Sequence, residues 1–428
     1  MKASIFYFTL VLACAAPTSA QQASAPALPL AQVLQQARDN NPEIKAARAD
    51  WQAARARVLP EKTWKAPQVG VEYWGFQGAS LGAAPEKWYD IAQDIPFPGK
   101  LRLKGAVADH EARRQEEIYK GVELDVVARV KTAYYRYLFT TQARRTLEEN
   151  VAVMREFTKV AAAKYATGKS SQSDVLRAQV ELSKTLGALL TLEQEKDSAQ
   201  AQLNALLDRG PDEPLGMPED PGLAPLHLTY KDLEEAALSQ RPEVRAAGHY
   251  IEHMKANLSA QRAEYLPDFS LQYTRRTRDG MASDSIAMLK MSLPFLYFWR
   301  PRAQTQGATA ELEQAEAMLR SEQNTARSDV KSDWTKVQAV GRLVELYSTS
   351  ILPQAEQSVK VTETAYQSDR LGFLDLLDSQ RALLEFRLDF AQYVTQYGQS
   401  VAELERVLGV DLASLKPGTS EEHSHDHQ

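Results

Sequence analysis

The chain has 428 residues, a net charge of −6 and a hydrophobic fraction of 44%, which supplies enough apolar surface for folded cores and excludes general disorder. Its mean hydropathy is −0.42, and no apolar run reaches the roughly 18–20 residues that a spanning helix needs. These values exclude a polytopic helical membrane protein. The mild acidity gives no sign of nucleic-acid binding.

The N-terminus carries the pattern of an export signal. A lysine precedes apolar residues 5–13, and small residues end at Ala20, so residues 1–20 are predicted to be a secretory signal peptide. A rival cleavage before Cys14 would leave a lipid-anchored N-terminus, although the bulky Leu12 fits such a signal poorly. Cleavage after Ala20 leaves a mature chain without cysteine, so neither disulfides nor thiolate metal sites are expected.

The chain contains an internal repeat with an offset of about 200 residues. Asn41-Pro42-Glu43 matches Arg241-Pro242-Glu243, and later matches, such as Asp174 with Asp375, keep an offset of 201. Chance similarity between Ala-rich helices would not keep this register through prolines and tyrosines. We therefore predict two copies of one unit, joined by a Pro- and Gly-rich linker. The predicted boundaries are 21–208 for the first copy, 209–227 for the linker and 228–412 for the second copy.

Both copies predict the same order of helices. A helix at about 42–66, or 242–266, precedes two alternating segments and then a very long helical stretch, about 100–166 or 302–369. Each long stretch would measure about 100 Å at ~1.5 Å per residue, and Pro353 is the one strong internal stop in them. The last helix of each copy has apolar residues spaced by sevens, which favours supercoiled helix pairs.

Four segments alternate apolar and polar residues with a period of two. They lie at about 68–77, 87–97, 268–277 and 286–296. Their length suits strands of a transmembrane barrel. Four of the six tryptophans lie in or beside them and would fit its aromatic girdles: Trp64, Trp74, Trp88 and Trp299. Because four strands cannot close in lipid, closure by several chains is expected. The alternative is a small soluble sheet packed on helices.

Taken together, these motifs resemble the TolC family of outer-membrane efflux factors. The resemblance rests on the duplicated halves, on Ile95-Pro96-Phe97-Pro98-Gly99-Lys100, and on Tyr165-x-x-Gly168 leading to Asp174-Val175-Leu176-x-x-Gln179, with a similar second copy from Tyr366 to Gln380. It implies a mainly α fold with a transmembrane β-barrel portion, in which three chains form a twelve-stranded barrel on a long α-helical tunnel across the periplasm. The Pro-Gly-Lys junction and the length look most like the heavy-metal (Cus/Czc-type) branch.

The resemblance implies a passive outer-membrane exit duct of a tripartite efflux system for heavy-metal cations. Its implied partners are two further copies of the chain in a homotrimer, a periplasmic adaptor (membrane fusion) protein, an inner-membrane RND-type pump and outer-membrane lipid. The alternatives are a similar duct for drugs or for type I secretion, and a soluble periplasmic coiled-coil scaffold. No enzyme activity and no cofactor are expected, because no catalytic constellation occurs and Ala163 stands where a phosphate-binding loop ending at Gly168-Lys169-Ser170 needs its first glycine.

The turns after the long helices are predicted to form the periplasmic tips. By resemblance, the residues that contact the adaptor there would be Gly168, Lys169, Ser170, Arg370, Leu371 and Gly372. Acidic residues of the second tip, repeated threefold, are candidates for a gate that attracts cations: Asp369, Asp375 and Asp378. For Asp375 the alternative is a capping role at the start of a helix.

Histidines supply two further candidate metal sites. Three of them lie with three carboxylates in the predicted disordered tail over 413–428 and could chelate a divalent or cuprous ion loosely: His423, His425 and His427. A solvated tail or an expression remnant is the alternative. His249 and His253 are spaced i, i+4 and could share a helix face, but alanines stand at both repeat-equivalent positions, so lone surface histidines are the alternative.

Overall fold

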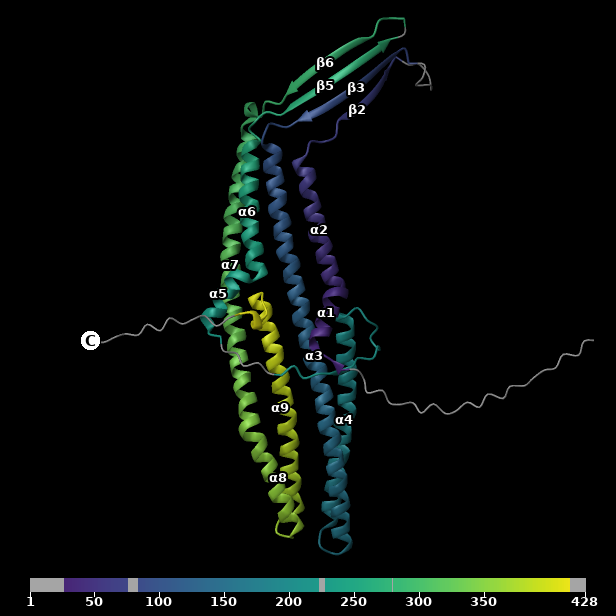
Figure 1. Ribbon diagram of the computed structural model, residues 1–428, viewed down its shortest axis with the longest axis vertical. Coiled ribbons are helices and arrows are strands. Elements are labelled where there is room, and N and C mark those ends of the chain that lie inside the picture. The colour runs from purple at the N-terminus through teal and green to yellow at the C-terminus, as the bar shows by residue number, and fades with distance from the viewer. Residues whose placement is uncertain (1–26, 76–83, 223–227, 279, 416–428) are drawn as a thin grey trace, which may run out of the picture.

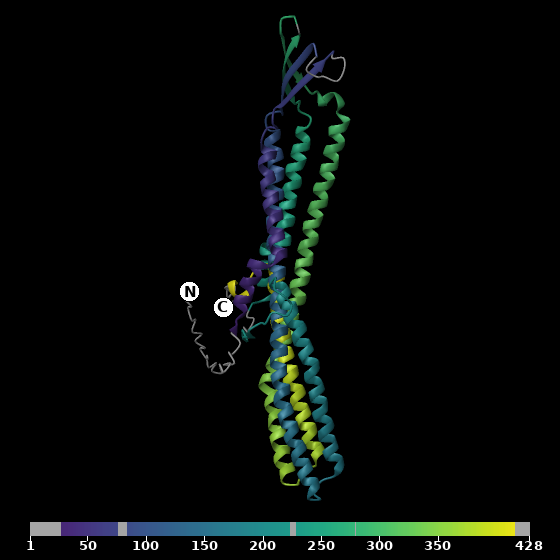
Figure 2. The same ribbon diagram turned by 90° about the vertical axis from the view of Figure 1, so that its right-hand side faces the viewer.

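The computed structural model describes residues 27–75, 84–222, 228–278 and 280–415. The molecule is long and narrow, with helices along one axis, a small sheet at one end and two helix–helix turns at the other (Figures 1 and 2). None of the helices in these ranges carries an apolar stretch that would let it cross a membrane. The predicted signal peptide, Cys14 and the three tail histidines lie outside the described residues.

The two repeats contain the same order of long elements, as expected for a duplicated unit. The first repeat contains β1 (Ala27–Leu28), α1 (Leu30–Asn40), α2 (Pro42–Lys62), β2 (Gln68–Trp74), β3 (Glu86–Ile95), α3 (Lys100–Ala166) and α4 (Gln172–Leu206). The second contains β4 (Met217–Pro218), α5 (Tyr230–Gln240), α6 (Pro242–Ala263), β5 (Phe269–Arg278), β6 (Asp284–Met291), α7 (Trp299–Leu346), α8 (Leu352–Gln367) and α9 (Phe373–Leu408).

The helix before the hairpin, α2 or α6, starts in a different way in each repeat. Asn41 caps α2, because its side-chain oxygen accepts from the backbone N–H of Glu43 at 2.9 Å and of Ile44 at 3.3 Å. In the second repeat Arg241 stands at this position and is 5% exposed. It donates to Glu243 at 3.2 Å and to Asp329 on α7 at 3.0 Å. An ion pair to a neighbouring helix thus replaces a local cap.

The long helix α3 is the axis of the whole chain. Toward the sheet it packs between α2 and α6, with α7 beyond α6; toward the turns it packs between α4 and α9, with α8 beyond α9 (Figure 1). At mid-length it contributes Tyr134 to a buried cluster with Val33, Val130 and Leu203. The Tyr134 hydroxyl lies 2.7 Å from the carbonyl oxygens of Leu28 and Glu219, next to the short β1–β4 pair.

The four expected strands form one antiparallel sheet in the order β2-β3-β5-β6. The predicted hairpins β2–β3 and β5–β6 are joined through β3–β5, so the sheet belongs to both repeats. Directly paired residues share one face. We call the face that carries Val69, Ile91, Tyr273 and Ala287 the apolar face, and the face that carries Glu72, Trp88, Arg276 and Asp284 the polar face.

Two of the four tryptophans expected in aromatic girdles lie on the polar face of the sheet. Trp74 and Trp88 lie on the polar face, 5.6 Å apart between ring centroids. Each indole N–H donates to a glutamate two residues away on the same strand, at 3.2 Å to Glu72 and at 2.7 Å to Glu86. The alternation of strand side chains puts these two rings on the polar face and their neighbours Tyr73 and Tyr89 on the apolar face. Trp64 and Trp299, both 59% exposed, flank the strands at the helix end.

Several predicted elements end earlier than the residue pattern suggests. The fourth strand stops at Met291 instead of 296, because Pro294 cannot donate to a ladder and begins a 3-10 turn over Pro294–Tyr297. The long stretch over 302–369 is divided between α7 and α8 by a π-helical turn, Tyr347–Ile351, just before Pro353. The proline ring excludes a regular α-helical bond at this point.

Candidate channel surface and tip

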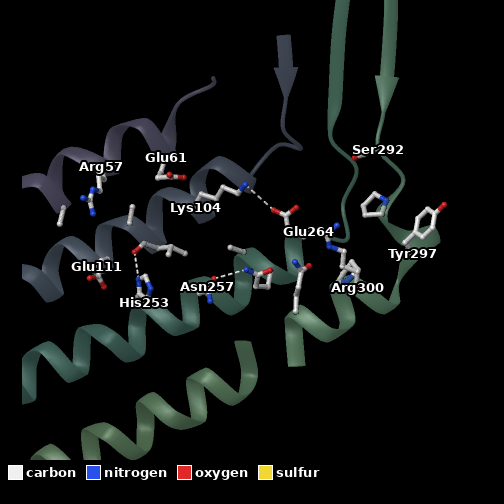
Figure 3. A pocket seen from close by; sticks show the side chains of 18 of the residues that line it. Arg57, Glu61, Lys104, Glu111, His253, Asn257, Glu264, Ser292, Tyr297 and Arg300 are labelled. Carbon is white, nitrogen blue, oxygen red and sulfur yellow. Dashed lines mark hydrogen bonds and ion pairs between the residues drawn. The ribbon is translucent and has the colours of Figure 1, made fainter. Parts of the chain in front are cut away.

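The helical layer nearest the sheet lines a cavity of about 1510 Å³ with residues from α2, α3, α6 and α7. Its wall carries both signs of charge, with Arg57 and Glu61 from α2, Lys104 from α3 and Glu264 from α6 (Figure 3). Lys104 and Glu264 form an ion pair at 3.7 Å. A wall of this kind is wet and favours no single class of organic ligand.

A second cavity of about 1400 Å³ lies at mid-length between α3, α4 and α9. Its charged side chains are paired with one another: Arg136 with Glu195 at 3.4 Å, and Arg406 with Asp125 at 3.3 Å. Arg129 pairs with Glu43 at the start of α2. These pairs leave little unbalanced charge on this part of the wall.

The junction between sheet and helices is held by a buried lysine. Lys100 is 3% exposed, and its ammonium contacts Glu264 at 3.3 Å, the Leu266 carbonyl at 2.9 Å and Asp268 at 3.0 Å. The other oxygen of Asp268 accepts from the backbone N–H of Phe97 at 2.9 Å. The Pro-Gly-Lys motif therefore ties the start of α3 to the α6–β5 connection of the other repeat, a partner that the motif alone did not reveal.

Each helix–helix turn at the far end relies on one residue with left-handed backbone. Gly168 has φ +72°, and at the repeat-equivalent position Asp369 has φ 57°. Asp375 and Asp174 cap the helices that follow, accepting from the backbone N–H of Gly372 at 3.1 Å and of Ser171 at 3.2 Å. The residues predicted to contact an adaptor lie on these two turns, where Leu371 is 39% exposed.

Ion pairs join the two hairpins near their turns. Lys164 on α3 contacts Asp369 at 2.6 Å and the Tyr366 carbonyl at 2.7 Å, and its ammonium lies 4.0 Å from the centre of the Tyr366 ring. The hydrogen bond from Lys164 holds the pKa of Asp369 below its usual value. Arg381 on α9 likewise pairs with Glu181 on α4 and, at 3.2 Å, with Asp378.

The three candidate gate acids thus have separate partners in this chain: a lysine for Asp369, a helix N-terminus for Asp375 and an arginine for Asp378. They lie along one tip but do not converge on one point. The sequence offered no signal for the pairs Lys164–Asp369 and Arg381–Glu181, because in each pair the carboxylate comes from the other repeat, about 200 residues away.

The histidines of α6 face different neighbours. The Nδ1 atom of His253 lies 2.9 Å from the Val107 carbonyl, and its ring lines the cavity near the sheet. Burial between α3 and α6 lowers the pKa of His249. Within the described residues no group of three His, Cys, Asp or Glu side chains is placed to hold a metal ion.

A sheet with one apolar, exposed face, joined to a long wall of paired helices, defines a channel-forming protein of the outer membrane. The chain belongs to the outer membrane efflux protein family, whose pattern matches residues 33–209 and 233–410. The pattern occurs once in each repeat, in agreement with the duplication. The chain is therefore an outer-membrane efflux channel with a helical extension into the periplasm.

Individual relatives are distant but cover most of the chain. The cobalt-zinc-cadmium resistance protein CzcC of Cupriavidus metallidurans is 21% identical over 329 residues, 74% of this chain and 75% of CzcC. Outer membrane protein OprJ of Pseudomonas aeruginosa is 25% identical over 410 residues, 89% of this chain and 84% of OprJ. A crystal structure of CusC has the same fold, with a TM-score of 0.77 at 18% identity over 92% of this chain and 96% of that one.

Proposed function

We propose that three copies of the chain form the working channel. Among the strands that the structure describes, the edge strands β2 and β6 each pair on one side only, and an open edge in lipid leaves backbone groups unsatisfied. Three four-stranded sheets joined edge to edge give a closed barrel of twelve strands, wide enough for a pore. The cavity faces of the helical layers then line the tunnel. An exposed apolar stripe on α4, which includes Leu176, Val180 and Leu190, supports contact with a neighbouring copy.

We propose that this trimer is a passive exit duct for heavy-metal cations, completed by a periplasmic adaptor and an inner-membrane pump of the RND type. The observation that supports this choice of cargo is the likeness, over 74% and 83% of this chain, to relatives named for cobalt-zinc-cadmium resistance and for cation efflux. The tail histidines His423, His425 and His427 support the same choice. A duct for organic compounds is the competing proposal, and the mixed charges of the cavity near the sheet suit it equally.

Deletion of the gene tests the cargo. We expect hypersensitivity to divalent or monovalent metal ions such as zinc, cobalt, cadmium, copper or silver, restored by the complete chain. The sensitivity of the same deletion strain to dyes and antibiotics is measured in parallel. Normal metal tolerance combined with drug hypersensitivity would reject the metal proposal and favour the organic duct. A chain that lacks residues 421–428 tests the tail separately, because full metal resistance without these residues would show that the tail histidines are dispensable.

We further propose that the tip residues Gly168–Ser170 and Arg370–Gly372 meet the adaptor, and that Asp369, Asp375 and Asp378 act at the gate. Replacing Asp369 and Asp375 by Asn should reduce the cation selectivity of single channels in planar bilayers, because threefold rings of carboxylates attract cations. Unchanged selectivity would leave these residues only their roles in the ion pair and the helix cap. Lys290→Gln, far from the tip, serves as the control.

A further inference from the structure

The charges of the sheet are divided unequally between its two faces. On the described strands, every acidic residue lies on the polar face: Glu72, Glu86, Asp90, Asp94 and Asp284. The cations of that face are engaged with them or with a neighbouring amide. Arg278 contacts Glu86 at 2.6 Å, Arg276 pairs with Asp284, and Lys290 donates to Gln272 at 3.1 Å.

The apolar face carries two cations and, within the described strands, no acid. Lys87 lies opposite Tyr73 and Thr277, and Arg275 lies opposite Tyr89. Among the described residues neither cation has an ion-pair or side-chain hydrogen-bond partner, and the Arg275 side chain is exposed. They are diagonal neighbours on the paired strands β3 and β5, at a separation that long side chains bridge easily.

The position of the two cations along the strands matches one edge of a membrane. Lys87 lies eight residues beyond Ile95, the last residue of β3 at the helix end. At ~3.3 Å per residue and a tilt of about 40°, Lys87 stands about 20 Å above that end, and Arg275, which pairs with Tyr89, stands about 15 Å above it. The apolar band of an outer-membrane barrel is about 25 Å tall, so both long side chains can extend to the headgroups at its far edge. These strand ends lie away from the helices (Figure 1). With the helices in the periplasm, they would therefore lie on the side of the outer leaflet.

An unpaired cation on a lipid-facing surface raises the free energy of the folded protein when it lies in the apolar part of the membrane. At the level of the headgroups it attracts anionic lipid instead. We propose that Lys87 and Arg275 of each chain bind the phosphate of a phosphorylated glycolipid in the outer leaflet, flanked by the hydroxyls of Tyr73 and Tyr89. Both cations lie on the central strands, so the contacts of β2 and β6 with neighbouring copies leave them accessible. The site is independent of the transported cargo.

Binding of lipid A to the purified full-length channel in phosphatidylcholine vesicles tests this site. The wild-type channel should retain bisphosphorylated lipid A on the order of tenfold more strongly than dephosphorylated lipid A, because two cations contribute near the headgroup. The double variant Lys87→Gln/Arg275→Gln should lose this preference. Lys290→Gln, which removes a cation of the polar face, is the matched control and should keep it.

Three results would overturn the proposal. Equal retention of both forms of lipid A by the wild-type channel would exclude phosphate recognition. Equal retention of phosphatidylglycerol would replace the outer-leaflet glycolipid by any anionic lipid, and efficient competition by inorganic phosphate would indicate a site for the free ion. If the double variant does not assemble, the exchange Lys87→Arg/Arg275→Lys keeps both charges and should keep the preference, and the comparison of lipids on the wild-type channel stands without any variant.

Discussion

The long helical segments of the two repeats, α3 and α7–α8, show how two copies of one unit diverge within one fold. In the first repeat α3 runs without interruption for 67 residues, whereas the second repeat has α7, a π-helical turn and α8 over the corresponding length. Helix α3 packs against helices on both sides along its whole length, while α7 and α8 lie at an edge of the chain. A central helix needs a regular backbone along its whole length, because neighbouring helices pack against it on both sides. A helix at the edge of the chain tolerates a break.

The largest expected effect comes from moving that break into α3. Ala152 is the repeat equivalent of Pro353 and is exposed, so Ala152→Pro changes the backbone with little loss of packing. It should lower the free energy of unfolding by about 3 kcal/mol or more per chain, since a helical proline removes a hydrogen bond and clashes with the preceding turn. Pro353→Ala should change it by less than about 1 kcal/mol. Denaturant unfolding followed by circular dichroism distinguishes the two; equal losses would refute the comparison.

The second largest effect is expected at the two junctions between strand and helix, where removal of the basic residue should lower the free energy of unfolding by different amounts. Lys100→Met removes a buried ammonium from two carboxylates and should cost about 2 kcal/mol, less than in a fully buried pair because both carboxylates are partly exposed. Arg300 occupies the matching region of the second repeat and is exposed, so Arg300→Met should cost less than about 0.5 kcal/mol. Unfolding of the purified protein, followed at one fixed protein concentration, measures both losses. A similar loss from the two variants would show that burial of Lys100 is not decisive.

A smaller difference in the free energy of unfolding is expected between variants of the two tip turns. A side chain at Gly168 would touch nothing within 4 Å, so Gly168→Ala tests only the left-handed backbone and should cost about 1 kcal/mol. Asp369→Asn should leave the unfolding free energy nearly unchanged, because asparagine also accepts this conformation and the carboxylate lost from the ion pair is exposed. Thermal melts of both variants provide the measurement, and an Asn variant that loses as much as the Ala variant would contradict this.

The smallest effect concerns pH. Burial lowers the pKa of His249 in the folded chain, with Glu117, Arg113, Arg245 and His110 nearby. As pH falls below about 6.5, the unfolded chain takes up a proton at this side chain while the folded chain resists it, so stability decreases until the lower folded pKa is reached. His249→Gln should flatten this part of the stability curve, because glutamine does not titrate. A profile identical to the wild-type one would exclude the effect.

Repetition and alternation made much of this architecture predictable. The 200-residue offset predicted the duplicated unit, and the period of two predicted four strands, because both patterns are local properties of the chain. The breaks at Pro294 and Pro353 were harder, since the effect of a proline depends on what the neighbouring backbone can offer instead. The contacts at the site were harder to predict from the sequence. The motif around Lys100 was visible, but its partners Glu264 and Asp268 belong to the other repeat.

The amino-acid sequence by itself determined the period, the family pattern and the residues of the tip turns, since propensity and turn chemistry act over a few residues. Tertiary structure decided on which face of the sheet or helix those residues lie and which side chains they contact. The strand pairs β2–β3 and β3–β5 placed Trp74 and Trp88 on the polar face and Lys87 and Arg275 on the apolar face. Packing of α3 against both halves placed Lys164 beside Asp369. Such pairings follow from burial and strand register across about 200 residues, which no local pattern encodes.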